Sequence, residues 1–284
     1  MPRPRRRFGQ HWLRSPKVLQ QIVAAAELSG CDRILEIGPG TGILTQALLA
    51  TGASVVAVEV DRDLCQRLVH QFGQNPQFLL LAGDILSLDL PMLLGGEAAP
   101  LFPNKVVANI PYYLTGEILQ LLLGQLSVPR LPRFESIVLL VQKEVAERVV
   151  ALPGSKTYGA LSVRVQCLAD CEWICAVPAK AFQPAPKVDS AVVRLRPRSY
   201  PIPIADPQWL ETLVRVGFAS RRKMLRNNLK AIVDLDGLTT TLTELNINPQ
   251  ARAEDLSVAE WVTLCDQLPR KPTAQTLQST EQSP

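Results

Sequence analysis

The amino-acid sequence predicts a doubly wound α/β sheet with a small helical domain after it. Four short runs rich in Val, Ile and Leu fit buried strands, at residues 33–37, 54–58, 78–81 and 105–108. Each run is followed by a glycine, an acid or an asparagine: Gly38, Glu59, Asp84 and Asn109. These positions lie 21 to 25 residues apart, which leaves room for one strand and one returning helix, so successive strands can be parallel. Ligands bind at the carboxyl ends of such strands, where the four residues would meet.

The rest of the first two hundred residues fits the same plan. Apolar residues spaced three and four apart predict a helix at 16–28, and a second helix is expected at 158–167. Three more strand-like runs follow the first four, at 136–141, 172–177 and 190–195. Seven strands in a mostly parallel, Rossmann-like sheet are therefore expected.

A proline-punctuated stretch at 196–207 marks a domain boundary. Helices are expected after it at 209–233, 238–245 and 258–268, so this part of the chain forms an all-helical C-terminal domain. The last residues are polar and poor in aromatic side chains. We therefore expect a first domain at 1–199, a helical domain at 200–268 and a disordered tail at 269–284.

Composition excludes several classes of protein. With 284 residues and 47% hydrophobic content the chain can fill a sizeable core, yet no apolar run approaches the length of a membrane span. The N-terminal arginines are not followed by the apolar stretch of a signal peptide. Six scattered cysteines fit a reducing cytosol, so we expect a cytoplasmic protein without disulfides, not bound to membrane.

Three of the cysteines, Cys167, Cys171 and Cys175, are spaced evenly by four residues. Zinc sites favour closer pairs and need a fourth ligand, which nothing nearby supplies. We expect small buried side chains around a strand and no metal. Oligomeric state is not fixed by the sequence, and a monomer is the default expectation.

Positive charge is concentrated at two places although the net charge is only +4. One is the N-terminal group Arg3, Arg5, Arg6 and Arg7. The other is the C-terminal group Arg221, Arg222, Lys223, Arg226 and Lys230. Such clusters suit nucleic-acid phosphates, but a solvated helix face has the same composition.

The turn after the first strand, residues 36–42, contains three glycines that let the backbone approach a ligand closely. The spacing G-x-G-x-G differs from the G-x-G-x-x-G of nicotinamide-dependent oxidoreductases, the main competing class. Glu59 suits ribose hydroxyls in either case. Asp84 can accept from an adenine amine, so Gly38, Glu59, Asp84 and Asn109 together resemble the cofactor motifs of class I S-adenosylmethionine-dependent methyltransferases. The alternative is that these acids cap the next helices.

The run Asn109-Ile110-Pro111-Tyr112 matches the N-[IL]-P-[YF] motif of enzymes that methylate adenine amines. An adenine amine is a poor nucleophile because its lone pair is delocalised into the ring. If the Asn109 oxygen and a backbone carbonyl near Ile110 or Pro111 accept its two N–H groups, the lone pair is directed at the methyl group. The ring of Tyr112 supplies a surface for base stacking, or is simply a core aromatic.

Longer motifs resemble the dimethyladenosine transferase family that acts on bacterial small-subunit ribosomal RNA. They span residues 8–13, 142–148, 158–163, 182–190 and 218–229. The first, F-G-Q-H-W-L, resembles the family motif F-G-Q-N-F-L, so the resemblance assigns cofactor contacts to His11, which replaces the family Asn, and to Leu13. It also places Phe182 against the target base and assigns RNA contacts to Lys187, Arg221, Arg222, Lys223 and Arg226.

This resemblance implies transfer of two methyl groups to each of two adjacent adenines in the loop of the 3′-terminal helix of 16S rRNA, within the 30S subunit. It also implies S-adenosyl-L-methionine as methyl donor and a role in subunit biogenesis. Two alternatives remain at this point. One is a 23S rRNA adenine dimethyltransferase of the macrolide-resistance type, and the other is a non-catalytic ribosome-assembly factor on the same fold.

Overall fold

The computed structural model describes residues 5, 9–100, 102–130, 134–200 and 204–271. The residues Arg3, Arg6, Arg7 and Phe8, and the expected tail beyond residue 271, lie outside these ranges. The chain forms two compact units. The first comprises 1–124, 130–150 and 169–198, and the second comprises 125–129, 151–168 and 199–284. Two short segments from the range expected for the first domain thus belong to the second unit.

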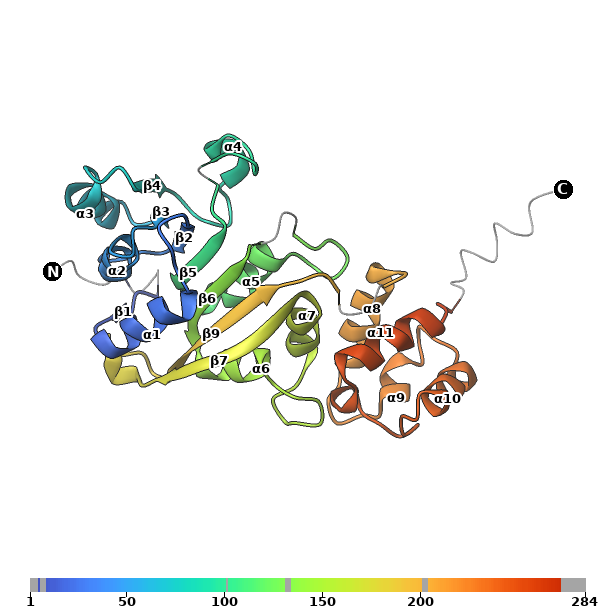
Figure 1. Ribbon diagram of the computed structural model, residues 1–284. Coiled ribbons are helices and arrows are strands. Elements are labelled where there is room, and N and C mark those ends of the chain that lie inside the picture. The colour runs from blue at the N-terminus through green and yellow to red at the C-terminus, as the bar shows by residue number, and fades with distance from the viewer. Residues whose placement is uncertain (1–4, 6–8, 101, 131–133, 201–203, 272–284) are drawn as a thin grey trace. The chain divides into compact units, whose positions relative to one another are not determined.

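The first unit contains a seven-stranded sheet whose strands lie side by side in Figure 1. Its spatial order is β4-β3-β2-β5-β6-β9-β7, and β9 alone runs antiparallel to its neighbours. In chain order the strands are β2 (Arg33–Ile37), β3 (Ser54–Glu59), β4 (Phe78–Ala82), β5 (Lys105–Asn109), β6 (Ser136–Gln142), β7 (Ala169–Val177) and β9 (Ser190–Pro197). The expected mostly parallel seven-stranded sheet is confirmed.

Helices alternate with the parallel strands, as the strand spacing predicted. They are α1 (Pro16–Ala26), α2 (Ile43–Leu49), α3 (Arg62–Phe72), α4 (Leu90–Leu94), α5 (Thr115–Leu123) and α6 (Lys143–Val149). Alternate residues of a strand point to opposite faces of the sheet. On one face Ile34 and Val107 pack with α1 and α2, and on the other face Leu35 and Val106 are buried. Both faces are covered, as parallel sheets require.

Strand order reverses beside β2, because β3 pairs with one edge of β2 and β5 pairs with the other. This is the switch point of the sheet, where the loops that follow β2 and β5 diverge. A two-stranded antiparallel ribbon lies in the same unit. It pairs β1 (Trp12–Leu13) with β8 (Phe182–Gln183), and the sequence did not predict it.

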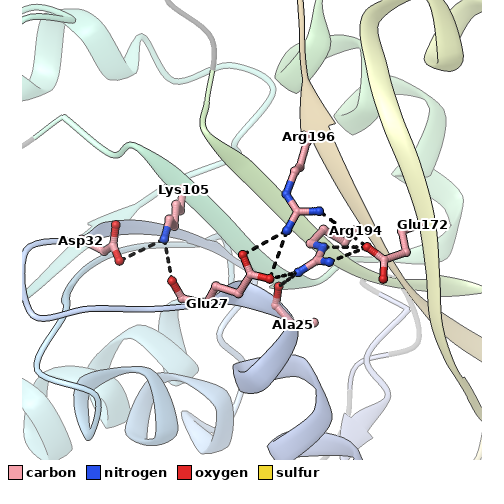
Figure 2. A network of polar contacts seen from close by, with 7 residues as sticks. All are labelled: Ala25, Glu27, Asp32, Lys105, Glu172, Arg194 and Arg196. Atoms are coloured by element: carbon pink, nitrogen blue, oxygen red, sulfur yellow. Dashed lines mark hydrogen bonds and ion pairs between the residues drawn. The ribbon is translucent and has the colours of Figure 1, made fainter.

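A polar network ties α1 to the sheet (Figure 2). Arg194 donates to the carboxylates of Glu27 and Glu172 and to the carbonyl of Ala25. Beside it, Lys105 donates to Asp32 at 3.1 Å and to the backbone carbonyl of Glu27 at 2.8 Å. Charged side chains on the strands thereby hold the C-terminal end of α1 and the loop that follows it.

The second unit is helical, with α7 (Ala160–Leu168), α8 (Pro207–Gly217), α9 (Leu225–Leu229), α10 (Leu235–Glu244) and α11 (Val258–Gln267). The expectation of one helix over 209–233 is wrong, because α8 ends at Gly217 and α9 begins at Leu225. The side chain of Asn228 donates to the carbonyls of Gly217 and Ser220 and so stabilises the interruption. In neither unit is a described helix long and apolar enough to span a bilayer.

Candidate active site

A cavity opens in the first unit at the carboxyl ends of β2, β3 and β5. Its walls come from the glycine-rich turn, the strand-end acids, the loop after β5 and the segment 9–13. The structure therefore brings six of the expected site residues to one place: His11, Leu13, Gly38, Glu59, Asp84 and Asn109. Pro111 and Tyr112 line the same cavity.

The glycine-rich turn needs glycine for steric reasons at two of its positions. Gly42 has φ +82°, and a Cβ there would lie 2.6 Å from Cε2 of Phe72. Gly40 has φ +59°, and a Cβ would lie 3.1 Å from the indole of Trp12. The left-handed conformation is costly for other residues. The turn is thus packed tightly against α3 on one side and against the N-terminal segment on the other.

Glu59 ends β3 inside the cavity wall, with 5% of its surface exposed. Its Oε2 accepts from the backbone N–H of Gly40 at 3.1 Å, and its Oε1 accepts from the N–H of Asp61 at 2.9 Å. Burial raises the pKa of Glu59, and these backbone donors partly oppose the rise. A carboxylate held in this way is fixed in place and keeps further lone pairs for ligand hydroxyls.

Glu36 also lines the cavity, a position that was not expected from the sequence. It is fully buried, its Oε2 accepts from the Thr45 hydroxyl at 2.6 Å, and its Oε1 has no hydrogen-bond partner among the described residues. Burial, with Glu59 nearby, raises the pKa of Glu36 to about 8 despite the Thr45 hydrogen bond. An acid within the apolar run of β2 was a sequence signal for this position, because an isolated charge is costly to bury.

Asp84 is exposed at the cavity edge after β4. Its Oδ1 accepts from the N–H of Leu86 at 3.0 Å, so this carboxylate supports the turn that follows β4. It does not cap the next helix, because the N-cap of α4 is Asp89. The hydrogen bond to Leu86 engages one oxygen of the Asp84 carboxylate, so the other oxygen remains an acceptor. The role of Asp84 as an acceptor for an adenine amine stays a prediction.

The loop after β5 presents an oriented amide. Nδ2 of Asn109 donates to the backbone carbonyl of His11 at 3.1 Å, which assigns the NH₂ group to that side and leaves Oδ1 as an acceptor. The carbonyl of Pro111 accepts from the N–H of Leu114 at 3.1 Å in the short 3₁₀ turn, whereas no described backbone donor is bonded to the carbonyl of Ile110. Of the two carbonyls considered, that of Ile110 is the one that no described backbone N–H occupies.

Tyr112 is half-buried beside Asn109 and is held at both ends. Its hydroxyl is hydrogen-bonded to the Ser190 hydroxyl, and its ring lies 5.9 Å from the His11 imidazole with an interplanar angle of 19°. Burial raises the pKa of Tyr112, so the phenol is neutral. The ring is a fixed flat surface at the cavity wall, as a base-stacking role requires.

Phe182 occupies a different setting from Tyr112. It pairs with Leu13 in the β1–β8 ribbon, is only 4% exposed, and packs in the core formed by α1 and the sheet. It is not among the residues that line the cavity. Its expected contact with a target base stays a prediction. Lys187, on the same loop, is exposed and available to an external partner.

The basic residues of the second unit do not lie on one continuous helix, because Arg221, Arg222 and Lys223 fall between α8 and α9 whereas Arg226 lies in α9. Arg222, Lys223 and Arg226 are exposed. Arg221 differs, because its guanidinium donates to the carbonyls of Lys156 and Tyr158 and pairs with Glu254 at 2.9 Å. Arg221 therefore stabilises the position of the segment that contains Lys156 and Tyr158, just before α7. Its contact with RNA stays a prediction.

Arg5, from the N-terminal basic group, is likewise engaged within its own unit. It pairs with Asp61 at 3.0 Å and with Asp63 at the start of α3. Gln10 donates to the second oxygen of Asp61 at 3.1 Å. Asp61 lies two residues after Glu59, so these contacts fix the N-terminal segment beside the cavity. No local sequence pattern indicates them.

Comparisons with known proteins agree with this geometry. The family model described as "Ribosomal RNA adenine dimethylase" matches residues 1–269. The protein named ribosomal RNA small subunit methyltransferase A from Acaryochloris marina is 62% identical over 266 residues, which cover 94% of this chain and 97% of that protein. Its namesake from a Nostoc species is 62% identical over 268 residues, covering 94% and 99%.

Two solved structures are also similar. A dimethyladenosine transferase from Plasmodium falciparum has a TM-score of 0.72 at 25% identity, covering 89% of this chain and 96% of that one. The 23S rRNA methyltransferase ErmE has a TM-score of 0.70 at 25% identity, covering 90% and 99%. The two structures match this chain about equally well, and the RNA named for ErmE is 23S rRNA, so fold similarity does not identify the RNA on which this chain acts.

Proposed function

The chain belongs to the ribosomal RNA adenine dimethylase family, and from that premise we propose that it dimethylates the N6 amine of two adjacent adenines near the 3′ end of 16S rRNA. The single observation that carries this proposal is the oriented amide of Asn109 in the cavity, in a chain 62% identical to small-subunit enzymes. The large-subunit enzyme ErmE, by contrast, is 25% identical to this chain.

We propose S-adenosyl-L-methionine as the cofactor, because the cavity offers matching groups. Glu59 has lone pairs for two ribose hydroxyls, Asp84 has one for an adenine amine, and the Gly38 turn leaves open space for the backbone to approach. Glu36 is protonated at neutral pH in the cofactor-free protein, and a positively charged ligand beside its unpartnered oxygen would favour the ionised form. His11 and Leu13 complete the wall. When bound, the cofactor supplies an electrophilic methyl group on a positively charged sulfur.

The chain's own contribution to catalysis is orientation of the amine. Oδ1 of Asn109 and the carbonyl of Ile110 would each accept one N–H of the adenine amine, which withdraws its lone pair from the ring and aims it along the attack direction. Tyr112 would stack on the base and hold it outside its helix or loop. No side chain has to act as a strong base, because the amine becomes acidic as it is methylated and water can take the proton.

The basic residues on the second unit would bind the ribosomal particle. The exposed basic side chains of that unit include Arg222 and Lys223, between α8 and α9, and Arg226 in α9. Lys187 is exposed on the first unit. Contacts of this kind recognise phosphates and RNA shape, so they supply salt-dependent affinity more than base discrimination. We propose 16S rRNA within the 30S subunit as the partner, a monomeric enzyme and a cytoplasmic location.

The experiment that tests this proposal offers the enzyme three substrates in parallel. Purified 30S subunits that lack the modification, intact 50S subunits and naked 23S rRNA each receive labelled S-adenosyl-L-methionine. We expect label in the 30S sample alone. Label in 23S rRNA would favour the resistance-type alternative, and cofactor binding without label in any sample would favour the non-catalytic assembly factor.

A further inference from the structure

His11 makes three contacts in the proposed target-base site, one through its backbone carbonyl and two through its imidazole ring. The first contact is made by its backbone. Its carbonyl oxygen accepts the Asn109 amide at 3.1 Å and so assigns which side of that amide is the acceptor. The second and third contacts are made by its imidazole ring, and they join segments that are far apart in the chain.

The imidazole makes a hydrogen bond to the loop after β8. Nδ1 of His11 lies 2.8 Å from the backbone carbonyl oxygen of Pro184. A carbonyl can only accept, so Nδ1 must carry the proton. In the neutral ring Nε2 is then the unprotonated nitrogen, a tautomer set by the protein rather than by solution preference.

The same ring contacts Tyr112. The two rings are nearly parallel, at 19°, and their centres are 5.9 Å apart, which is within the range of offset aromatic pairs. Ser190 holds the Tyr112 hydroxyl at the other end. The His11 ring therefore fixes the plane of the Tyr112 ring, the proposed stacking surface, and Ser190 fixes the position of the Tyr112 hydroxyl.

The residues on either side strengthen the link to the loop. Trp12 is opposite Gln183 and Leu13 is opposite Phe182 in the β1–β8 ribbon. The N–H of Arg14 donates to the carbonyl of Ala181 at 2.7 Å. The hydrogen bond between His11 and Pro184 thus continues the backbone pairing of the β1–β8 ribbon. These contacts together hold the His11 ring in place against Tyr112.

We propose that His11 is a positioning residue that sets the Asn109 amide, the Tyr112 ring and the Pro184 loop in register with one another. This inference rests on the proposed function and adds a role to the cofactor contact expected at this position. Asn, which the family motif has here, keeps the backbone carbonyl and an N–H donor but has no ring. In this chain the imidazole supplies both the donor and the ring contact.

The first test needs no activity. His11 and His70 are the two histidines of the chain, and His70 is exposed on α3. The His70→Asn variant therefore leaves a single imidazole for nitrogen-15 NMR. We expect the neutral ring to carry its proton on Nδ1. A ring protonated on Nε2 alone would overturn the Pro184 contact and the proposal with it.

The second test separates the two functions of the ring by kinetics at saturating cofactor. His11→Asn keeps a donor and removes the ring, His11→Phe keeps the ring and removes the donor, and His11→Ala removes both. We expect kcat/KM for the RNA substrate to fall about 2- to 10-fold in each of the first two variants, the size of effect typical of an aromatic pair or a hydrogen bond, and further in the third.

His70→Asn is the matched control and should retain the wild-type values. If all three His11 variants alter only the dissociation constant of S-adenosyl-L-methionine, and methylate RNA normally at saturating cofactor, His11 is a cofactor ligand and the proposal fails. A wild-type enzyme that methylates no RNA would contradict the proposed function instead, and the NMR test would still decide the Pro184 contact.

Discussion

The amide nitrogen of Asn109 donates a 3.1 Å hydrogen bond to the backbone carbonyl of His11, a residue 98 positions earlier in the chain. In solution the carboxamide of an Asn side chain rotates easily about its Cβ–Cγ bond, so either its oxygen or its NH₂ group could face a ligand. This bond occupies the NH₂ end, so the oxygen is the end available to an amine. The segment that lines one side of the cavity thereby orients the Asn109 amide, and in the proposed mechanism its oxygen faces the substrate amine.

We expect Asn109→Ala to abolish methyl transfer and to leave the affinity for S-adenosyl-L-methionine within a few-fold of wild type. The variant removes the acceptor that orients the amine, whereas the Glu59 and Glu36 carboxyls remain in the cavity wall. Isothermal calorimetry measures cofactor affinity and label transfer measures activity. Glu117→Ala, an exposed change on α5, is the surface control. Full activity in Asn109→Ala would refute the orientation mechanism.

Glu36→Gln should change how the stability of the cofactor-free protein depends on pH. The pKa of Glu36 is raised from 4.5 to about 8, so between these values the folded protein keeps a proton that the unfolded chain has released. Wild-type stability therefore falls as pH rises through this window. Gln cannot ionise, so the stability of the variant relative to wild type should rise by roughly a few kcal/mol between pH 5.5 and pH 8.5. Urea unfolding at pH 5.5 and 8.5 measures the difference, which should be smaller at the lower pH; a constant difference would show that Glu36 does not titrate in this range.

Asp32 should have the opposite pH dependence. Burial acts to raise its pKa, but hydrogen bonds from Asn104, Ser29 and Lys105 outweigh burial and lower the pKa from 3.8 to about 2 (Figure 2 shows the contact with Lys105). A lowered folded-state pKa contributes stability that is present above about pH 4 and is lost as pH falls toward 2. The contribution is roughly 2 kcal/mol at neutral pH.

Asp32→Asn should therefore destabilise the first unit at pH 7 and much less near pH 2.5. Thermal unfolding followed by calorimetry at both values tests this. Glu117→Gln, an exposed carboxyl on α5, is the control for removal of an acid. An equal loss for Asp32→Asn at both pH values would mean that lost packing, and not lost charge, causes the effect.

Reversal of charge at Arg222 and Lys223, with both changed to Glu, should weaken binding to 30S subunits and reduce the slope of affinity against salt concentration. These side chains are exposed between α8 and α9, so folding should be unaffected. Each lost phosphate contact lowers the salt slope by about one unit. Filter binding at several salt concentrations measures both quantities, and unchanged values would show that the two residues are merely solvated.

Arg221→Ala should act on stability more than on RNA affinity. The guanidinium bonds to two backbone carbonyls and to Glu254, and these contacts join three parts of the second unit. Because the side chain is about half exposed, we expect a loss of only about 1 kcal/mol in the unfolding of that unit. Arg222→Ala is the matched control. Equal stability of the two variants would contradict the structural role of Arg221.

Much of the fold could be predicted because its signals are local. The strands Arg33–Ile37 and Ser54–Glu59 are apolar runs that end at a glycine and an acid, and their spacing implies a parallel sheet. The break after Gly217 was missed because the apolar spacing continues through it. A side-chain amide, that of Asn228, stabilises the interruption from eleven residues away, and the packing of Gly217 against Trp261 depends on a helix far along the chain.

The place of the candidate site in the fold could be predicted from the positions of its polar residues along the chain. Glu59, Asp84 and Asn109 stand at strand ends, and strand ends converge in this topology. The β1–β8 ribbon and the Arg5–Asp61 pair could not be predicted, because each joins segments that only the folded chain brings together. Phe182 shows the same limit, since its burial is set by pairing with Leu13.

The most direct test of the central claim is the chemical identity and position of the product. Undermethylated 30S subunits would be incubated with the enzyme and S-adenosyl-L-methionine, and 16S rRNA fragments would be sequenced by mass spectrometry. We predict two adjacent N6,N6-dimethyladenosines near the 3′ end, absent when Asn109→Ala replaces the wild-type enzyme. Methyl groups on a different base, on ribose oxygens or only in 23S rRNA would contradict the account.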